Sequence, residues 1–111
     1  MGKLNLKNVE EIAHGDRFFI RSILSVFVTE SEAYWGEVIT SHKKDIEVFR
    51  KAVHKAKSAA ANIAQGDLIT ELLEIELNAE RNMWPEKEQI ESLTERWNIL
   101  VGEADAYVKA N

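Results

Sequence analysis

The sequence predicts an all-α fold, an antiparallel four-helix bundle with a short additional helix at the N-terminus. Three observations lead to this prediction. Apolar residues recur three and four positions apart along four long stretches, and no stretch alternates as a strand does. Only five glycines and one proline interrupt the chain. The connections between the helices are therefore expected to be short, and residues 1–111 are predicted to form one domain around one core.

The first two predicted helices are separated by Gly15-Asp16. Asn5 is expected to cap a short helix that Gly15 ends, and Asp16 to cap a long helix that runs to about Thr40. The inward residues of the short helix are Leu6, Val9, Ile12 and Ala13. Those of the long helix are Ile20, Ile23, Leu24, Phe27, Ser31, Tyr34, Trp35 and Val38.

Three further helices follow a polar joint at residues 41–44. Asp45 is expected to cap a helix that runs to Gln65, with Gly66 as its left-handed stop. The next helix is predicted to start after Asp67 and to fade near Asn82, with Leu68, Ile69, Leu72, Leu73, Ile75, Leu77 and Ala79 inward. Pro85 suits the first turn of the last helix. The inward apolar residues of this last helix are Ile90, Leu93, Trp97, Leu100, Val101, Ala104 and Tyr107 or Val108.

Composition excludes several classes of function. The net charge of -5 at pH 7 argues against a nucleic-acid binder, which needs a basic face. The absence of cysteine removes disulfides, thiolate metal sites and cysteine nucleophiles. No apolar run approaches the roughly 20 residues that span a bilayer. We therefore expect a cytoplasmic protein that binds neither nucleic acid nor a membrane. We also expect it to act as a monomer.

His54 is the candidate reactive residue. On a helical wheel Phe49, Val53, Ala56, Ala60 and Ile63 form the buried stripe, and His54 lies about 140° away from it. Its neighbours on that exposed strip are Arg50, Lys57, Ser58 and Ala61. Six of the ten residues from 54 to 63 are Ala, Ser or Asn, which a soluble helix does not require. Small residues there would let another protein approach the histidine closely.

The run His54, Lys57, Ser58, Ala59 and Ile63 resembles the phosphorylation motif of histidine-containing phosphotransfer (HPt) domains. The resemblance covers nearly the whole chain, from the Gly15-Asp16 pair before the long helix to the acidic stretch at residues 74–80. In two places the sequence departs from the family, which often has glycine where Ser58 and Ala64 stand. The resemblance implies that His54 accepts a phosphoryl group on Nε2 from a receiver-domain aspartate and passes it to another receiver domain.

The resemblance also implies roles for the neighbouring residues. Lys57 would offset charge on the phosphoryl oxygens, while the small Ser58 and Ala61 leave Nε2 open. Docking of a partner is assigned to Arg50 and Lys55, from a basic cluster at residues 43–57, and to a second apolar strip of the long helix formed by Phe19, Val26 and Ala33. The alternative for that strip is that the short first helix covers it. The implied partners are response-regulator receiver domains, which carry the Mg²⁺, and an upstream hybrid histidine kinase.

Other functions have weaker support in the sequence. No phosphate-binding glycine loop is present, so autokinase activity is not expected, and no cofactor is implied. Glu11 and His14 have the spacing of a di-iron ligand pair, but no second copy follows, so no metal is predicted. The alternative function is a non-catalytic helical protein-interaction module in which His54 is incidental. The sequence does not identify the upstream kinase, the downstream regulator or the signal, nor whether the chain belongs to a larger hybrid kinase.

Overall fold

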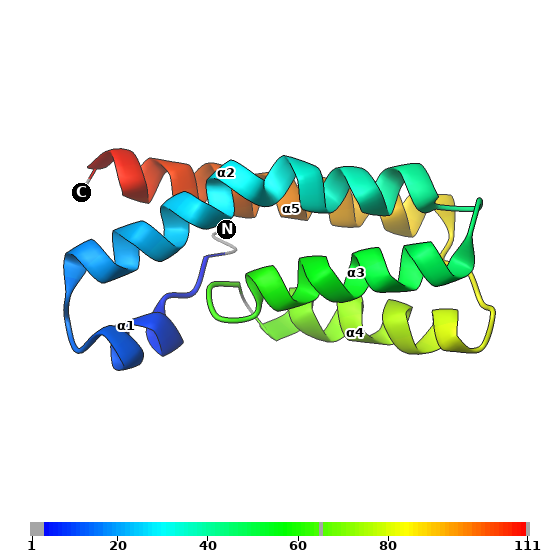
Figure 1. The fold of residues 1–111 in the computed structure, drawn as a ribbon, viewed down its shortest axis with the longest axis horizontal. Helices are drawn as coiled ribbons and strands as arrows, with labels where there is room; N and C mark the ends of the chain where they lie inside the picture. Colours follow the sequence, from blue (N-terminus) through cyan, green and yellow to red (C-terminus); the bar gives the residue numbers. More distant parts are fainter. Residues whose placement is uncertain (1–3, 65, 111) are drawn as a thin grey trace.

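The computed structural model describes residues 4–64 and 66–110 and is all-helical apart from an isolated bridge between Leu4 and Ala64. Its helices are α1 (Lys7–Ala13), α2 (Arg17–Ser41), α3 (Ile46–Ala60), α4 (Gly66–Glu80) and α5 (Lys87–Ala110). Helix α2 packs against both α3 and α5, and α3 packs against α4 (Figure 1). The short α1 lies against the N-terminal part of α2.

Side-chain caps begin the second and third helices, as the sequence predicts. One carboxylate oxygen of Asp16 accepts hydrogen bonds from the Phe18 and Phe19 amides at 3.0 and 3.2 Å. Asp45 does the same for the Glu47 and Val48 amides of α3. These bonds satisfy N–H groups that the first turn of a helix leaves free. The left-handed backbone of Gly15, with φ of 82°, separates α1 from α2 as expected.

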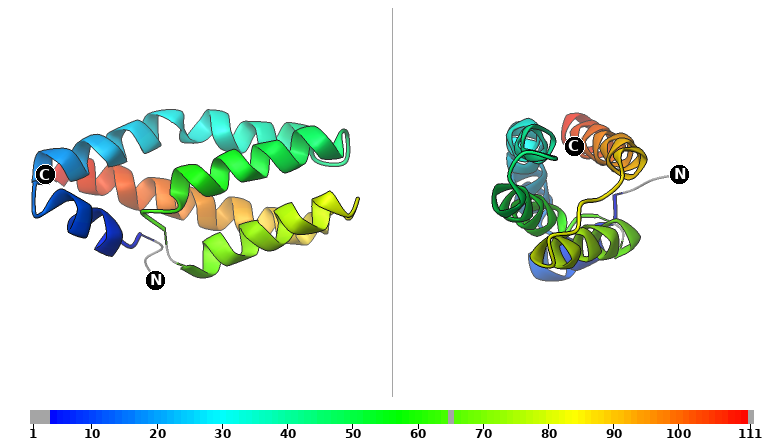
Figure 2. Two further views of the ribbon diagram at one scale, coloured as in Figure 1. Left: turned by 60° about the horizontal axis from the view of Figure 1, so that its bottom comes forward. Right: turned by 90° about the vertical axis from the view of Figure 1, so that its right-hand side faces the viewer.

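The core lies between the four long helices, whose arrangement Figure 2 shows from two further directions. Trp97 of α5 stacks on Trp35 of α2 with ring centroids 5.0 Å apart, and Phe27 packs against it at 5.3 Å. The predicted buried stripe of α3 is confirmed: Phe49, Val53, Ala56, Ala60 and Ile63 are all buried. This stripe sets the rotation of α3 and thereby places the opposite side of the helix in solvent.

Helix α3 ends at Ala60, which corrects the predicted end at Gln65. Gln65 itself lies outside the described residues. Residues 61–64 leave the helix because they meet the N-terminal segment, where the Asn5 amide donates to the Ile63 carbonyl at 2.7 Å. Gly66 is not a left-handed stop but the first residue of α4. A contact between distant parts of the chain thus overrides the helical pattern.

Other predicted positions also need correction. Ile12 of α1 and Leu73 and Leu77 of α4 were expected in the core but are exposed. Helix α4 is rotated so that Glu76 is buried beside Leu72 and Ile75 instead. Helix α5 begins at Lys87, so that Pro85 precedes its first turn rather than standing in it. The Glu86 carbonyl accepts the first hydrogen bonds of that helix.

Helices α4 and α5 are joined by polar side chains. An Arg96 nitrogen lies 2.7 Å from a Glu71 oxygen, and the Gln89 amide donates to the other Glu71 oxygen at 3.4 Å. Within the described residues, no helix is long and apolar enough to cross a membrane.

Candidate functional site

His54 lies in the middle of α3, on the side away from the core. Its side chain is 56% exposed, as the helical wheel predicts. The other two histidines differ from it. His14 is the exposed C-cap of α1, while the half-buried His42 packs between Phe49 and Trp84. A ring nitrogen of His42 also lies 3.3 Å from the Pro85 carbonyl oxygen. Within residues 4–64 and 66–110, His54 alone among the three combines an exposed ring with an acidic partner.

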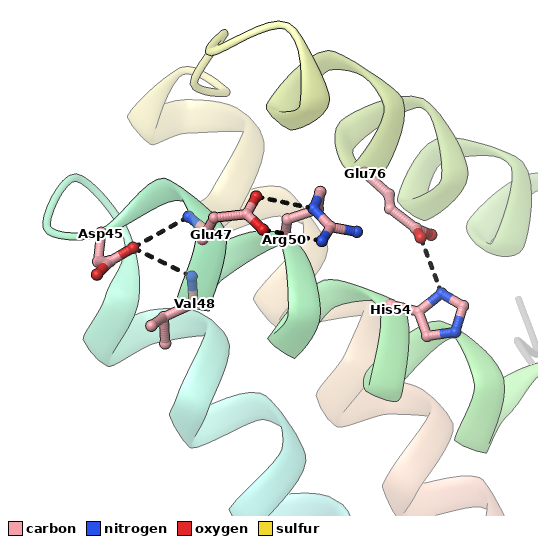
Figure 3. Close-up of polar contacts among 6 residues, drawn as sticks. All are labelled: Asp45, Glu47, Val48, Arg50, His54 and Glu76. Carbon is pink, nitrogen blue, oxygen red and sulfur yellow. Dashed lines mark hydrogen bonds and ion pairs between the residues drawn. The ribbon is translucent and has the colours of Figure 1, made fainter.

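That acidic partner is Glu76 of α4, whose side chain is only 10% exposed. Glu76 Oε2 lies 2.8 Å from His54 Nδ1 (Figure 3). A carboxylate can only accept, so Nδ1 carries the proton of this hydrogen bond. In the neutral ring the lone pair is then on Nε2, and Figure 3 shows this second nitrogen pointing away from Glu76. The contact therefore fixes both the tautomer and the orientation of the imidazole.

Lys57 forms an ion pair with the other carboxylate oxygen of Glu76. Its Nζ lies 2.7 Å from Glu76 Oε1, and its side chain is 18% exposed. Burial by itself raises the pKa of Glu76, but hydrogen bonds from Lys57 and His54 together lower it further. The pKa of Glu76 is therefore below its ordinary value, and the group is a carboxylate at neutral pH.

The position of Lys57 bears on the role that the sequence suggested for it. Lys57 was expected beside the phosphoryl oxygens at Nε2. The structure instead places its ammonium group at Glu76, which contacts the opposite ring nitrogen. The expected pair His54 and Lys57 is thus brought together, but through a third residue. In the described conformation the charge of Lys57 is compensated by that carboxylate.

Small residues border the exposed side of His54. Ser58 and Ala61 are exposed, and Ala59 is half-buried. An open hollow of about 630 Å³ between α2 and α3 is lined by Tyr34, His54, Lys55, Ser58 and Ala59. Tyr34 had been expected only as a core residue. Apart from Lys55, the described α3 residues that line this hollow beside His54 are the small Ser58 and Ala59.

The basic residues near His54 are partly engaged by acids. Arg50 makes two bonds to Glu47, at 3.0 and 3.1 Å, which Figure 3 also shows. This pairing lowers the pKa of Glu47 and raises that of Arg50. Lys55 Nζ lies 3.6 Å from a carboxylate oxygen of Glu37 in α2. Both predicted docking cations therefore lie at the surface next to His54, each with an acidic neighbour.

The predicted apolar strip of α2 is exposed. Val26 is 57% exposed and Phe19 41%, and Ala33 is exposed as well, so α1 does not cover the strip. Phe19 and Val26 line an apolar hollow of about 370 Å³, with Tyr34 and Ala59 at one end. Tyr34 and Ala59 also line the hollow at His54. An apolar surface therefore runs along α2 to the exposed histidine.

Glu76 is the residue of this site that the sequence analysis missed. In the sequence Glu76 is one of several acids in the stretch at residues 74–80. Its position beside Leu72, Ile75 and Ala79 in the buried part of α4 was the available signal, because an acid in an apolar stripe requires a partner. In residues 4–64 and 66–110, no group of three metal-binding side chains converges.

Comparison of the chain with family models, with curated proteins and with solved structures gives no match.

Proposed function

We propose that this chain is a histidine phosphotransfer protein of the HPt kind. His54 accepts a phosphoryl group from a receiver-domain aspartate and passes it to another receiver domain. The observation that carries the proposal is the contact between His54 Nδ1 and the buried carboxylate of Glu76, at 2.8 Å, in an exposed ring whose Nε2 points away from Glu76. A partner that fixes the proton on one nitrogen leaves the other as a nucleophile, which an incidental surface histidine does not need.

The chemistry requires little else from this chain. The Nε2 lone pair attacks phosphorus of the aspartyl phosphate, an Nε2–P bond forms, and the P–O bond to the aspartate breaks. The aspartate leaves as a carboxylate with the bonding electrons. The Nδ1 proton stays in its hydrogen bond to Glu76, which stabilises the positive charge that develops on the ring. Transfer onward is the same step in reverse, with the next aspartate as the acceptor.

Lys57 acts in this proposal through Glu76. By pairing with Oε1 it keeps the carboxylate ionised and directs Oε2 to His54. Ser58 and Ala61 provide clearance for the receiver domain, whose aspartate and Mg²⁺ complete the reaction centre. We expect no cofactor on this chain and no autokinase activity. Phosphoryl transfer depends mainly on positioning and electrostatics, so a small helix face can serve.

The wider assignments belong to the same proposal. The four long helices would form the antiparallel four-helix bundle of HPt domains, with α1 as the short additional helix. The receiver would dock on the apolar surface of α2 at Phe19 and Val26 and on the basic residues Arg50 and Lys55. An upstream hybrid kinase would supply the phosphoryl group through its own receiver, and the chain would act as a cytoplasmic monomer. Exposure of the apolar surface next to His54 supports this docking site.

The test is phosphoryl transfer from a panel of phosphorylated receiver domains to the purified chain. We expect acid-labile, alkali-stable label on His54, and none in His54→Gln. This variant should remain folded, because Lys57 still pairs with Glu76, and its melting temperature should fall only by the loss of the His54–Glu76 hydrogen bond, whereas His14→Gln and His42→Gln should retain the label. Label that persists in His54→Gln would refute the assignment. A chain that binds receivers but takes no label would instead be the non-catalytic interaction module.

A further inference from the structure

Two lysines flank His54 on different sides. Lys57 lies at Glu76, on the Nδ1 side of the ring. Lys55 extends toward α2, where its Nζ lies 3.6 Å from Glu37, and it lines the hollow between α2 and α3 with His54. The Nε2 atom points away from Glu76 (Figure 3). Lys55, unlike Lys57, lines the hollow between α2 and α3 together with His54.

We infer that Lys55 is the cation that binds the phosphoryl group on His54 and that Glu37 releases it when the group arrives. The inference rests on the proposed function. It assigns to Lys55 the contact with the phosphoryl oxygens that the spacing of the motif had suggested for Lys57.

An exchange of partners by Lys55 is physically reasonable. The ion pair between Lys55 and Glu37 has a distance of 3.6 Å, and both side chains are exposed. Such surface ion pairs contribute little to the free energy of unfolding. A phosphoryl group on Nε2 brings nearly two negative charges and three acceptor oxygens to the neighbouring residue. The lysine side chain is a flexible stem with a compact charge, so it can turn from Glu37 to the phosphoryl group without a change in the helix.

The other described residues that line this hollow offer no competing lysine or arginine. Tyr34 donates its hydroxyl proton to Glu30 at 2.8 Å, one turn away along α2, and Ser58 and Ala59 are uncharged. Among the described residues that line this hollow, Lys55 is the only lysine or arginine. Lys57, by contrast, would have to leave a shorter and more buried pair. Lys55 can therefore leave Glu37 more easily than Lys57 can leave Glu76.

Lys51 provides a matched control. It is exposed, lies one turn before Lys55 on α3, and lines a smaller hollow beside His54, of about 290 Å³. It carries the same charge but does not line the hollow between α2 and α3. Among the described residues, the charged side chains that line the hollows at His54 or pair with a lining residue are Glu47, Arg50, Lys51, Lys55 and Lys57 from α3, Glu30 and Glu37 from α2, and Glu76 from α4.

The experiment follows the phosphoryl group by ³¹P NMR after the intact chain has been labelled with phosphoramidate, a donor that needs no docked protein. In that reaction the P–N bond of the donor breaks and ammonia leaves. The Lys55→Met variant should move the titration midpoint of the phosphoryl group upward by about half a pH unit, roughly a threefold change in its dissociation constant, because the dianion has lost its cation. Lys51→Met and Lys57→Met should move it much less. Circular dichroism confirms that each variant is folded.

Each other outcome overturns the inference in a recognisable way. A Lys55→Met midpoint equal to the wild-type midpoint, or equal shifts in Lys55→Met and Lys51→Met, would show that Lys55 makes no specific contact. A larger shift in Lys57→Met would return the role to Lys57. A wild-type chain that takes no label on His54 overturns the proposed function together with the inference, whereas a labelled chain with an unmoved titration overturns the inference alone.

Discussion

Replacement of Glu76 by glutamine should switch His54 to the unreactive tautomer. Glu76 accepts from His54 through one oxygen and is paired with Lys57 through the other. Glutamine has nearly the same shape but only one oxygen, and its NH₂ group can only donate. Because the Lys57 ammonium is also only a donor, the amide oxygen has to face Lys57. The NH₂ group then faces His54 Nδ1, which becomes the acceptor, and the proton of the neutral ring moves to Nε2.

The size of the effect follows from the contact that is lost. A hydrogen bond to a charged group contributes about 1.5–3 kcal/mol. Since about 1.4 kcal/mol corresponds to a tenfold change in rate, labelling of His54 should slow by about 10- to 100-fold. The free energy of unfolding should fall by about 1–2 kcal/mol. This loss is larger than that for breaking an exposed ion pair and smaller than that for breaking a fully buried one. We expect an intermediate value because Lys57 and Glu76 are both largely but not completely buried.

The assay is the initial rate of labelling by phosphoramidate, with ¹⁵N NMR of the His54 ring to identify the tautomer. The double variant Glu76→Gln with Lys57→Met is the diagnostic partner. Without the ammonium group the amide oxygen is free to turn toward His54, so part of the lost rate should return. A Glu76→Gln rate within twofold of the wild-type rate would refute this reasoning, as would a double variant that is no faster than Glu76→Gln.

Four further predictions test the proposed docking surface, the pH dependence of the stability that Glu76 contributes, and the packing of the core. Ser58→Trp should fold normally and take label from phosphoramidate, yet lose most transfer from a receiver domain; equal retention of both rates would place the approach of the partner elsewhere. Val26→Asp should likewise weaken receiver transfer severalfold and spare the small donor, and an unchanged receiver rate would exclude the α2 surface. Because the pKa of Glu76 is lower in the folded chain than its ordinary 4.5, the stability it contributes is present above about pH 4.5 and is lost as pH falls through the folded value. The difference in urea midpoint between wild type and Glu76→Gln should therefore shrink in acid, and a difference constant from pH 6 to 3 would contradict it. Phe49→Ala should cost about 3–5 kcal/mol, as measured by chemical denaturation, because Phe49 is fully buried; a loss below about 1 kcal/mol would show that this core position is loosely packed.

Local rules were sufficient for much of the helical layout. Asp16 and Asp45 cap α2 and α3 as predicted, because a cap depends only on amides two and three residues away. The apolar period of α3 likewise fixed its buried stripe and the exposure of His54. The end of α3 did not follow from such rules. Residues 61–64 leave the helix to meet Asn5, and no pattern within α3 contains that contact.

The sequence by itself determined which face of each helix carries His54, Ser58 and Val26, because the position on a helical face depends only on the spacing along the chain. Only the tertiary structure decided what those faces meet. Glu76 lies 22 residues from His54, and its contact depends on how α4 is rotated against α3. The same rotation gave Lys57 a carboxylate and left Lys55 beside the open hollow, although both lysines are equally long and flexible. Spacing sets the direction in which a side chain leaves its helix, but the charge it finally contacts belongs to another helix, and only packing of the core sets that helix in place.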